Sequence, residues 1–302
     1  MDICLAFLKL IPKQAPTMKD TLDQLVVTKA SGEKVLFSVG KLRLSLLKSG
    51  ADEEQADEVI RQLVPELTPG ISTKKIYRKA FAILKRISST AAARYSLKQG
   101  IMELGPSGFP FEKFVAEILR AQGYLTEIGV FIDGHCVRHE IDVLAVKDGR
   151  RVMIECKYHN LKRNKSDVKI PMYIHSRFKD VEKVWPSENE FEIRFHEVWV
   201  MTNTRFTEDA IRFASCMQMK LIGWDYPHKG GLKDIVDSYR LYPLTTLTTL
   251  TKAEKQRLLD LKIVLCSELL HHEELLHRAG LNEERAKRVM KEVEDLCNGR
   301  YA

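Results

Sequence analysis

Apolar residues recur along the chain either at helical spacing, every three or four residues, or in short strand-like runs. The changes from one pattern to the other divide the chain into blocks. Two short β-rich runs within residues 26–38 flank Ser31-Gly32, a pattern typical of a hairpin with a tight turn. Asp52 and Ser72 are placed to cap two of the helices that follow. The first block, residues 19–105, is therefore predicted to be a small domain of one hairpin and several helices. Apolar residues recur at helical spacing in residues 39–50, 52–64 and 72–87.

The second block, residues 106–240, begins with a helical pattern and then alternates between strand-like and helical runs. The first helical pattern is amphipathic and ends at Gly123. Three strand-like runs follow, separated by turns at Asp133-Gly134 and Asp148-Gly149. The order α-β-β-β-α-β-α-β predicts a mixed sheet with helices on its faces, an α/β (α+β) fold. The later helical and strand-like runs alternate at residues 168–184, 196–202, 207–217 and 220–224.

The ends of the blocks are marked by composition. Residues 103–110 carry two glycines and two prolines and form the clearest linker. The third block, residues 241–302, reads as short helices, and its turn Ala279-Gly280-Leu281 resembles that of a helix-hairpin-helix module. Residues 1–18 are interpreted as an N-terminal extension. No run approaches the roughly 20 apolar residues of a membrane span, so no membrane partner is expected.

Charge and cysteine usage narrow the function classes. The chain carries 48 basic and 41 acidic residues, a formal net charge of +7, and no acid lies between Glu66 and Glu103. That basic stretch favours phosphate as a partner, in a nucleotide or in a nucleic-acid backbone. The six cysteines are scattered and form no CxxC pair, which argues against a zinc ribbon and a disulfide framework. Their spacing favours a reducing, cytoplasmic location.

The residues with the clearest chemical potential lie on two successive strand-like runs, HEIDVLAV and RVMIECKY. Asp142 lies on the first run, and Glu155 and Lys157 lie on the second. Residues two apart in a strand share a face, so Glu155 and Lys157 emerge side by side, and an antiparallel hairpin brings Asp142 opposite them. The expected result is two carboxylates and an ammonium at the end of an apolar sheet. The alternative is a surface hairpin whose charges are solvated.

Such a set of side chains suits phosphodiester hydrolysis. The carboxylates of Asp142 and Glu155 are the kind of ligand that Mg²⁺ or Mn²⁺ prefers, and the backbone carbonyl of Cys156 is a further candidate ligand. A metal ion bound there supplies Lewis-acid chemistry. Lys157 is then placed to orient the attacking water or to stabilise the developing negative charge. The sequence therefore predicts a metal-dependent site for phosphodiester hydrolysis.

A series of short motifs carries a family resemblance. Gly-x-Pro-Phe-Glu at the start of a helix, Gly-Tyr after it, and then EIDV and IECK resemble the Mrr-like branch of the PD-(D/E)xK nucleases. The resemblance covers about residues 107–225. It implies an αβββαβ core and the activity of a metal-dependent endodeoxyribonuclease, similar to restriction endonucleases.

The same resemblance implies roles for individual residues. It implies one more acid near the metal from the first helix, for which Glu112 is the first choice and Glu117 the second. It also makes His159 a candidate phosphate contact, with a partly buried strand-end histidine as the alternative. By resemblance, the metal ligands and the catalytic lysine are Asp142, Glu155 and Lys157.

A second resemblance concerns the first block. Val27-x-Lys29-x-x-Gly32, the Phe37-Ser38 step, Lys41-Leu42 and Arg94-Tyr95 resemble the ATP-cone, the nucleotide-sensing domain of ribonucleotide reductases. The resemblance implies ATP or dATP as a regulatory ligand. Ala30 departs from the pattern, because a basic residue is usual there. A small helical domain with basic faces that contact DNA is the alternative. The residues implied in nucleotide binding are Lys29, Gly32, Lys41, Arg94 and Tyr95.

Two hypotheses from different classes remain. The first is a Mg²⁺-dependent DNA endonuclease that is regulated by ATP or dATP. The second is a non-catalytic, nucleotide-sensing DNA-binding protein that keeps the nuclease fold as a platform. Retention of Asp142, Glu155 and Lys157 favours the enzyme, because a platform has no need of all three. Cutting both strands of a duplex usually calls for a dimer, so a homo-oligomer is a candidate assembly, although the sequence leaves the oligomeric state open.

Overall fold

The computed structural model describes residues 24–29, 31–184 and 195–298. The expected N-terminal extension and Ala30 lie outside these residues. The chain divides into two compact units, residues 1–88 and residues 89–302, and each is described by itself. Among the described helices, none is long and apolar enough to cross a membrane.

The first unit contains the predicted hairpin and helices. Strands β1 (Val26–Thr28) and β2 (Lys34–Leu36) pair antiparallel around Gly32, whose φ of 87° suits a residue without a Cβ. Asp52 forms a capping box with Gln55, and Ser72 accepts the N–H of Lys75, so both predicted caps are present. The helices are α2 (Val39–Leu47), α3 (Glu53–Leu63) and α4 (Thr73–Ile87), with the 3-10 helix η1 (Val64–Glu66) after α3. Their apolar faces enclose a core that includes Leu46, Val59, Leu63 and Leu84, each fully buried.

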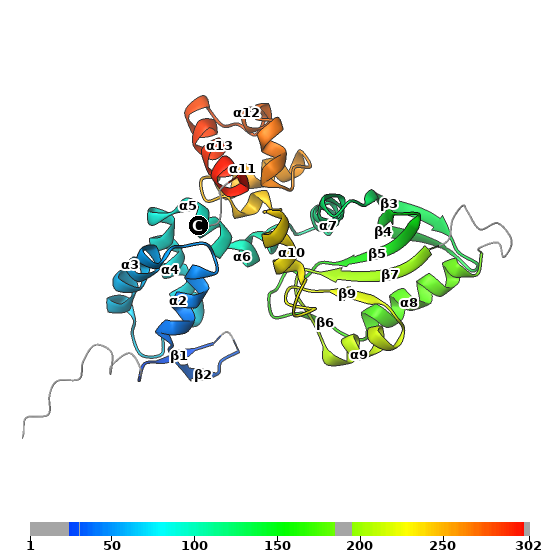
Figure 1. Ribbon diagram of the computed structural model, residues 1–302, viewed down its shortest axis with the longest axis horizontal. Helices are drawn as coiled ribbons and strands as arrows, with labels where there is room; N and C mark the ends of the chain where they lie inside the picture. Colours follow the sequence, from blue (N-terminus) through cyan, green and yellow to red (C-terminus); the bar gives the residue numbers. More distant parts are fainter. Residues whose placement is uncertain (1–23, 30, 185–194, 299–302) are drawn as a thin grey trace, which may run out of the picture. The chain divides into compact units, whose positions relative to one another are not determined.

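The second unit is built on a five-stranded mixed sheet with the order β3-β4-β5-β7-β9 (Figure 1). Strands β3 (Leu125–Asp133), β4 (Arg138–Lys147) and β5 (Arg150–Lys157) form an antiparallel meander. Strands β7 (Phe195–Thr202) and β9 (Lys220–Ile222) run parallel to β5. Asp148 and Gly149 both have positive φ, 50° and 75°, as a tight two-residue hairpin turn requires. The predicted mixed sheet is therefore confirmed.

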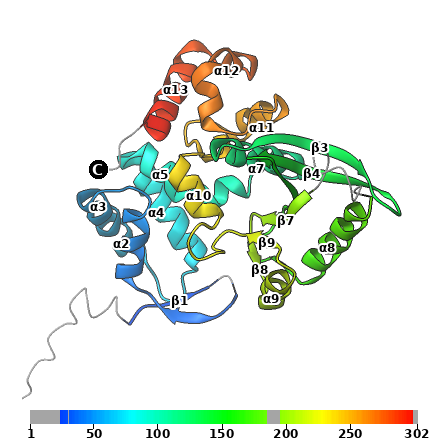
Figure 2. The same cartoon turned by 45° about the vertical axis from the view of Figure 1, so that its right-hand side comes forward.

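Helices cover both faces of this sheet (Figures 1 and 2). Alternate residues of β5 enter different apolar clusters: Val152 and Ile154 join the cluster that contains helix α7 (Phe109–Ala121), and Met153 joins the other. The second cluster includes residues of α8 (Lys169–Glu182) and α9 (Glu208–Cys216). Because both faces are buried, β5 carries an almost continuous apolar run that is interrupted only where Glu155 appears. Two further short strands, β6 (Lys165–Ser166) and β8 (Arg205–Phe206), pair parallel beside the sheet.

The first block was predicted to end at residue 105, whereas the first unit of the structure ends at Ser88. Helices α5 (Ser89–Tyr95) and α6 (Leu97–Ile101) belong to the second unit. A Cβ on Gly100 would lie 2.4 Å from Cγ2 of Thr246, so glycine permits the close approach of α6 to the C-terminal region. Sequence patterning shows that a helix has an apolar face, but it does not show which partner covers that face.

The C-terminal helices share their core with the nuclease-like sheet. One apolar cluster contains Phe114 of α7, Leu258 of α11 (Lys252–Asp260) and Val293 of α13 (Glu283–Asn298). The predicted helices of the third block are present, but they do not form a separately packed module. The remaining helical elements are α10 (Leu232–Tyr239), η2 (Leu244–Thr246), η3 (Cys266–His271) and α12 (Glu274–Arg278).

Candidate active site

The site begins where the pairing of β4 with β5 ends. The ladder runs from Lys147 and Arg150 to Val143 and Ile154. Just beyond it, the Oδ2 atom of Asp142 accepts the N–H of Cys156 at 2.7 Å, in place of a main-chain acceptor. This hydrogen bond fixes the carboxylate of Asp142 beside the segment that carries Glu155.

Glu155 is held from the other side by a residue that the sequence analysis missed. The Nη1 atom of Arg177, on α8, donates to the Oε2 atom of Glu155 at 2.8 Å, and the two side chains are only 10% and 19% exposed. The second terminal nitrogen of Arg177 donates to the backbone carbonyl of Glu140. No local signal in the sequence indicates Arg177, because it lies on a different element and follows no recognisable spacing.

Helix α8 is fixed so that Arg177 reaches the site. One turn after Arg177, Asp180 accepts the N–H of Cys136 at 2.9 Å and lies 2.8 Å from the Nε2 atom of His139. Both contacts tie α8 to the tip of the β3–β4 hairpin. The position of the guanidinium is therefore set by the fold and not by Glu155 alone.

The carboxylates of the site repel one another in a poorly solvated place. The pKa of Glu155 is raised to about 7, first by burial and then by the negative charge of Asp142, although Arg177 and Lys157 oppose both effects. Burial also raises the pKa of Asp142, although the hydrogen bond from the Cys156 N–H and the positive charge of Arg177 act to lower it. A cation that binds here relieves this repulsion, so the electrostatics favour a positively charged ligand.

Glu112 belongs to the same electrostatic environment. It lies in the first turn of α7, and burial raises its pKa to about 7, with Asp142 and Glu140 as the further causes. Glu117, the other candidate, accepts a hydrogen bond from Arg120 at 2.5 Å. Glu112 therefore stays the first choice for the additional acid, and the assignment stays a prediction.

The donor set fits a hard divalent cation that keeps part of its water shell. Among the described residues, no group of three or more His, Cys, Asp or Glu side chains is arranged to hold a metal ion. Asp142 and Glu155 offer two carboxylates, which is the number that Mg²⁺ commonly takes from a protein. Burial raises the pKa of the Cys156 thiol well above its usual value, so only the backbone carbonyl of Cys156 suits this ion.

His159 lies just past the end of β5 in a polar network. Its Nε2 atom is 3.0 Å from the Oγ atom of Ser166, and its backbone N–H donates to Oδ1 of Asn203 at 2.8 Å. The Asn203 side chain also donates to the His159 carbonyl at 2.9 Å. One ring nitrogen is thus engaged within the protein, as expected of a half-buried strand-end histidine. The phosphate contact stays a prediction.

A second missed residue, Lys98, lies behind the same network. Its Nζ atom donates to the Asn203 carbonyl at 2.8 Å and lies 4.2 Å from the centre of the Trp224 ring. The pKa of Lys98 is lowered to about 7, mainly by burial and in addition by the positive charge of Arg205. Lys98 falls in the first block of the sequence, so its contact with Asn203 of the second block could not be predicted from local patterns.

The candidate nucleotide-binding residues are divided between the two units. Lys29, Gly32 and Lys41 lie in the first unit, where Lys29 forms an ion pair with Glu33 at 2.9 Å. The other two, Arg94 and Tyr95, lie on α5 in the second unit. The guanidinium of Arg94 lies 5.9 Å from the centre of the Tyr242 ring.

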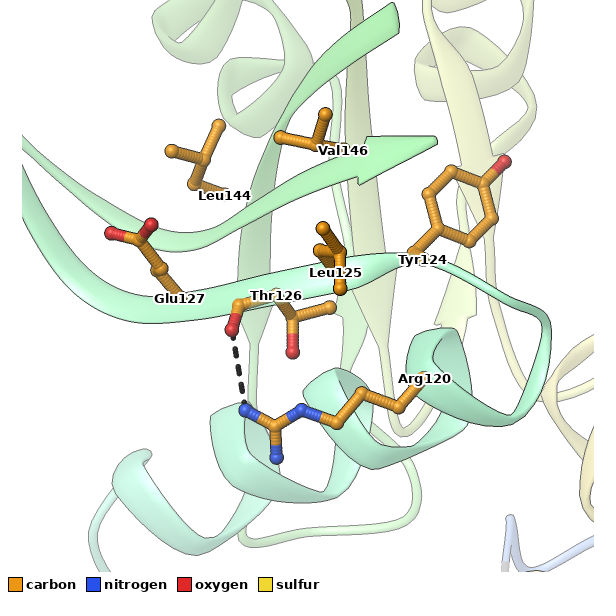
Figure 3. Close-up of a pocket in the computed structure, with 7 residues that line it drawn as sticks. All are labelled: Arg120, Tyr124, Leu125, Thr126, Glu127, Leu144 and Val146. Carbon is orange, nitrogen blue, oxygen red and sulfur yellow. Dashed lines mark hydrogen bonds between the residues drawn. The ribbon is translucent and has the colours of Figure 1, made fainter. Parts of the chain in front are cut away.

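A hollow of about 330 Å³ lies beside the edge strand β3, where Arg120 donates to the carbonyl of Thr126 at 3.2 Å (Figure 3). None of the candidate catalytic side chains lines it, so it is distinct from the carboxylate site. Its lining residues are Arg120, Tyr124, Leu125, Thr126, Glu127, Leu144 and Val146.

Comparison with known proteins agrees with this geometry. The profile of the Mrr_cat family, described as restriction endonuclease, matches residues 105–226. That range contains the αβββαβ elements and all the candidate catalytic residues. A second profile, described as AF1548-like, C-terminal, matches residues 242–297. An uncharacterized protein of Archaeoglobus fulgidus is 38% identical over 183 residues, which cover 60% of this chain and 99% of that protein.

The chain belongs to the AF1548-like family. A crystal structure titled as protein of unknown function AF1548 is 36% identical, with a TM-score of 0.53, and the match covers 64% of this chain and all of that one. A structure of protein VC1899 from Vibrio cholerae is 13% identical over 66% of this chain and 51% of that one, with a TM-score of 0.29. Both profile matches of this AF1548-like protein lie in the second unit, which carries its restriction endonuclease domain.

Proposed function

We propose that this protein is a DNA endonuclease that depends on Mg²⁺ or Mn²⁺. Asp142 and Glu155, with the carbonyl of Cys156, are the proposed ligands, and Lys157 is the proposed catalytic lysine. The observation that carries the proposal is the hydrogen bond from the Cys156 N–H to Asp142, which holds one carboxylate beside the strand that presents Glu155 and Lys157. The match to the restriction endonuclease family supports the reaction class.

The residues of the site divide the work of phosphodiester hydrolysis. The cation, when bound, supplies positive charge that polarises the phosphoryl group. Lys157, two residues after Glu155 on β5, shares its side of the strand and places an ammonium near the charge that develops on the phosphate. Glu112, with a pKa of about 7, can accept or release a proton at neutral pH. Arg177 holds Glu155 in place before the substrate arrives.

The test of this proposal is cleavage of plasmid, linear and branched DNA by the full chain with Mg²⁺ or Mn²⁺, and with EDTA. The parent protein, Asp142→Asn and Glu155→Ala are compared with Glu208→Ala, at an exposed position on α9, as the matched control. We expect cleavage by the parent and by the control, and its loss in both site variants and in EDTA. Equal cleavage by Glu155→Ala and the parent would show that these residues are not the active site.

The alternative function is a non-catalytic, nucleotide-sensing DNA-binding protein that uses the fold as a platform. The raised pKa values of Glu112 and Glu155 weigh against it, because like charges crowded in a buried site destabilise the folded chain and are retained where they serve a reaction. DNA binding by the parent without cleavage of any of the substrates, under all metal conditions, would favour the platform.

Regulation by ATP or dATP is the second part of the proposal. It is supported by the hairpin-and-helix build of the first unit and by Lys29, Gly32 and Lys41, which match the ATP-cone pattern. Arg94 and Tyr95 stay candidates for nucleotide binding. In this proposal the nucleotide is a ligand, and its effect on cleavage is read by adding ATP or dATP to the assay above. A cytoplasmic location and a homo-oligomer that cuts both strands belong to the same proposal.

A further inference from the structure

An aromatic side chain stands exposed on the flank of the candidate active site. Tyr173, on α8, is 62% exposed, and its neighbour Met172 is 48% exposed, whereas the next residue, Ile174, is buried in the core. Exposed single apolar residues are common, so the exposure alone means little. Tyr173, however, also lies close to the carboxylate site, which indicates a functional role for the exposed ring.

Arg177 connects the ring to that site. Its guanidinium carbon lies 5.6 Å from the centre of the Tyr173 ring, and its Nη1 atom lies 2.8 Å from Oε2 of Glu155. The aromatic ring, the guanidinium and the carboxylate are therefore successive neighbours. Because Arg177 is only 10% exposed, it is a fixed support for the ring.

The chain around Tyr173 is basic. After the end of β5, the exposed residues 160–165 lead into β6, and α8 begins shortly after β6. This segment suits a phosphodiester backbone that enters the site next to Tyr173. The exposed bases of the segment and of the first turn of α8 are Lys162, Arg163, Lys165 and Lys169.

We propose that Tyr173 is a stacking platform for an unpaired nucleobase of the DNA substrate, next to the phosphate that is cut. The proposal rests on the proposed nuclease function and names its substrate class: DNA with unpaired nucleotides at the cleavage position, as in a bubble, a flap or a frayed end. In a paired duplex both faces of a base are covered by neighbouring bases. An exposed ring therefore gains a partner only where a base is unstacked.

The experiment measures DNA binding in EDTA, so that it does not depend on cleavage. Full-length parent protein, Tyr173→Leu and Tyr173→Phe are titrated onto a fully paired duplex and onto the same sequence with a short central bubble. The bubble contains 2-aminopurine, whose fluorescence falls when it stacks. Tyr239→Leu is the matched control, because Tyr239 is also exposed, at 48%, but lies on α10.

We expect Tyr173→Leu to bind the bubble roughly 5- to 150-fold more weakly than the parent, which is the loss of one base–aromatic stack. Binding to the paired duplex should stay unchanged. Tyr173→Phe and Tyr239→Leu should resemble the parent, and the quenching of 2-aminopurine should be lost only in Tyr173→Leu.

Several results would overturn the stacking role. These are an equal loss on both DNAs, no loss on either, or no binding of the bubble by the parent. A change of sedimentation behaviour in Tyr173→Leu without a selective DNA effect would instead make this surface a contact between two copies of the chain. If the parent cuts DNA while Tyr173→Leu binds both DNAs normally, only the stacking role fails. If the selective loss is seen but no DNA is cut, only the nuclease proposal fails.

Discussion

The Nη1 atom of Arg177 lies 2.8 Å from the Oε2 atom of Glu155, so a guanidinium neutralises one of the two carboxylates that we propose as cation ligands. A divalent cation must compete with this ion pair. Replacing Arg177 by Gln should therefore raise the affinity for Mg²⁺ roughly tenfold, or about 1.4 kcal/mol. The measurement is calorimetric titration of the full chain without DNA at about pH 9, where carboxyl groups with a pKa of about 7 are ionised.

Lys179→Gln is the control for this titration, because Lys179 lies on the same helix and pairs with Glu182 on the exposed side. Its Mg²⁺ affinity should equal that of the parent. An Arg177→Gln variant that binds Mg²⁺ no better than the parent would show that the guanidinium does not compete for the cation position.

Lys98 should make the stability of the protein depend on pH. Its pKa is lowered to about 7 in the folded chain, mainly by burial, whereas a lysine in the unfolded chain titrates near its ordinary value. Between these two values the unfolded chain binds more protons, so this residue makes stability rise with pH from about 7 to about 10. Replacing Lys98 by Met removes the effect.

The difference in melting temperature between the parent and Lys98→Met should therefore change by a few degrees over this window, in favour of the parent at high pH. The exposed Lys252 provides the control variant, Lys252→Met, which should track the parent at every pH. If the melting temperatures of the parent and Lys98→Met change with pH in the same way, the Lys98 ammonium is not destabilised by its surroundings.

Much of the fold follows from the sequence because its elements have strong local signals. The alternation in HEIDVLAV and RVMIECKY, with Asp148-Gly149 between them, predicts the β4–β5 hairpin, and the structure has it. The same alternation places Glu155 and Lys157 on one side of β5. Arg177 and Lys98 were not predictable in this way. Arg177 reaches Glu155, and Lys98 reaches Asn203, each from a distant helix, and only tertiary packing decides which helix faces the ends of these strands.

The C-terminal block shows the same limit of local patterns. Its helices were predicted, but the turn at Ala279-Gly280-Leu281 suggested a separate module similar to a helix-hairpin-helix. In the structure the nearby Arg285 donates to Glu254 at 2.7 Å and supports the fold. Lys113 of α7 donates to Glu268 at 2.8 Å, so the block is also tied to the nuclease-like core by an ion pair. Removing the block would therefore expose that core.

Glu292 is an anchor of this shared core. It is 2% exposed, and its carboxylate accepts the N–H groups of Thr248 and Thr249 at 2.8 Å and 2.9 Å. Glu292→Ala leaves both donors without this acceptor and should lower the free energy of unfolding by about 3 kcal/mol. Urea denaturation checks this, with Glu294→Ala on the exposed side of α13 expected to cost less than about 0.5 kcal/mol. Equal midpoints for the two variants would contradict an anchoring role.

Nucleotide binding by the first unit is tested on the full chain. A ligand that binds only the folded state raises the melting temperature. Millimolar ATP or dATP should therefore raise that of the parent by a few degrees, and Lys29→Ala should lose most of the effect. Lys74→Ala, at an exposed position on α4, should keep it. The absence of a shift in the parent would leave the unit as a DNA-contacting domain.

The most direct test of the central claim is the single-turnover rate of DNA cleavage by Lys157→Met with saturating Mg²⁺. Lys157 is placed to act where charge develops on the phosphate, so its loss should lower the rate by about 100-fold or more. DNA affinity in EDTA should stay within about twofold, because the ammonium is needed chiefly in the transition state. Lys252→Met, at an exposed position on α11, should cleave at the parental rate. A Lys157→Met protein that cuts as fast as the parent would contradict the account of this site.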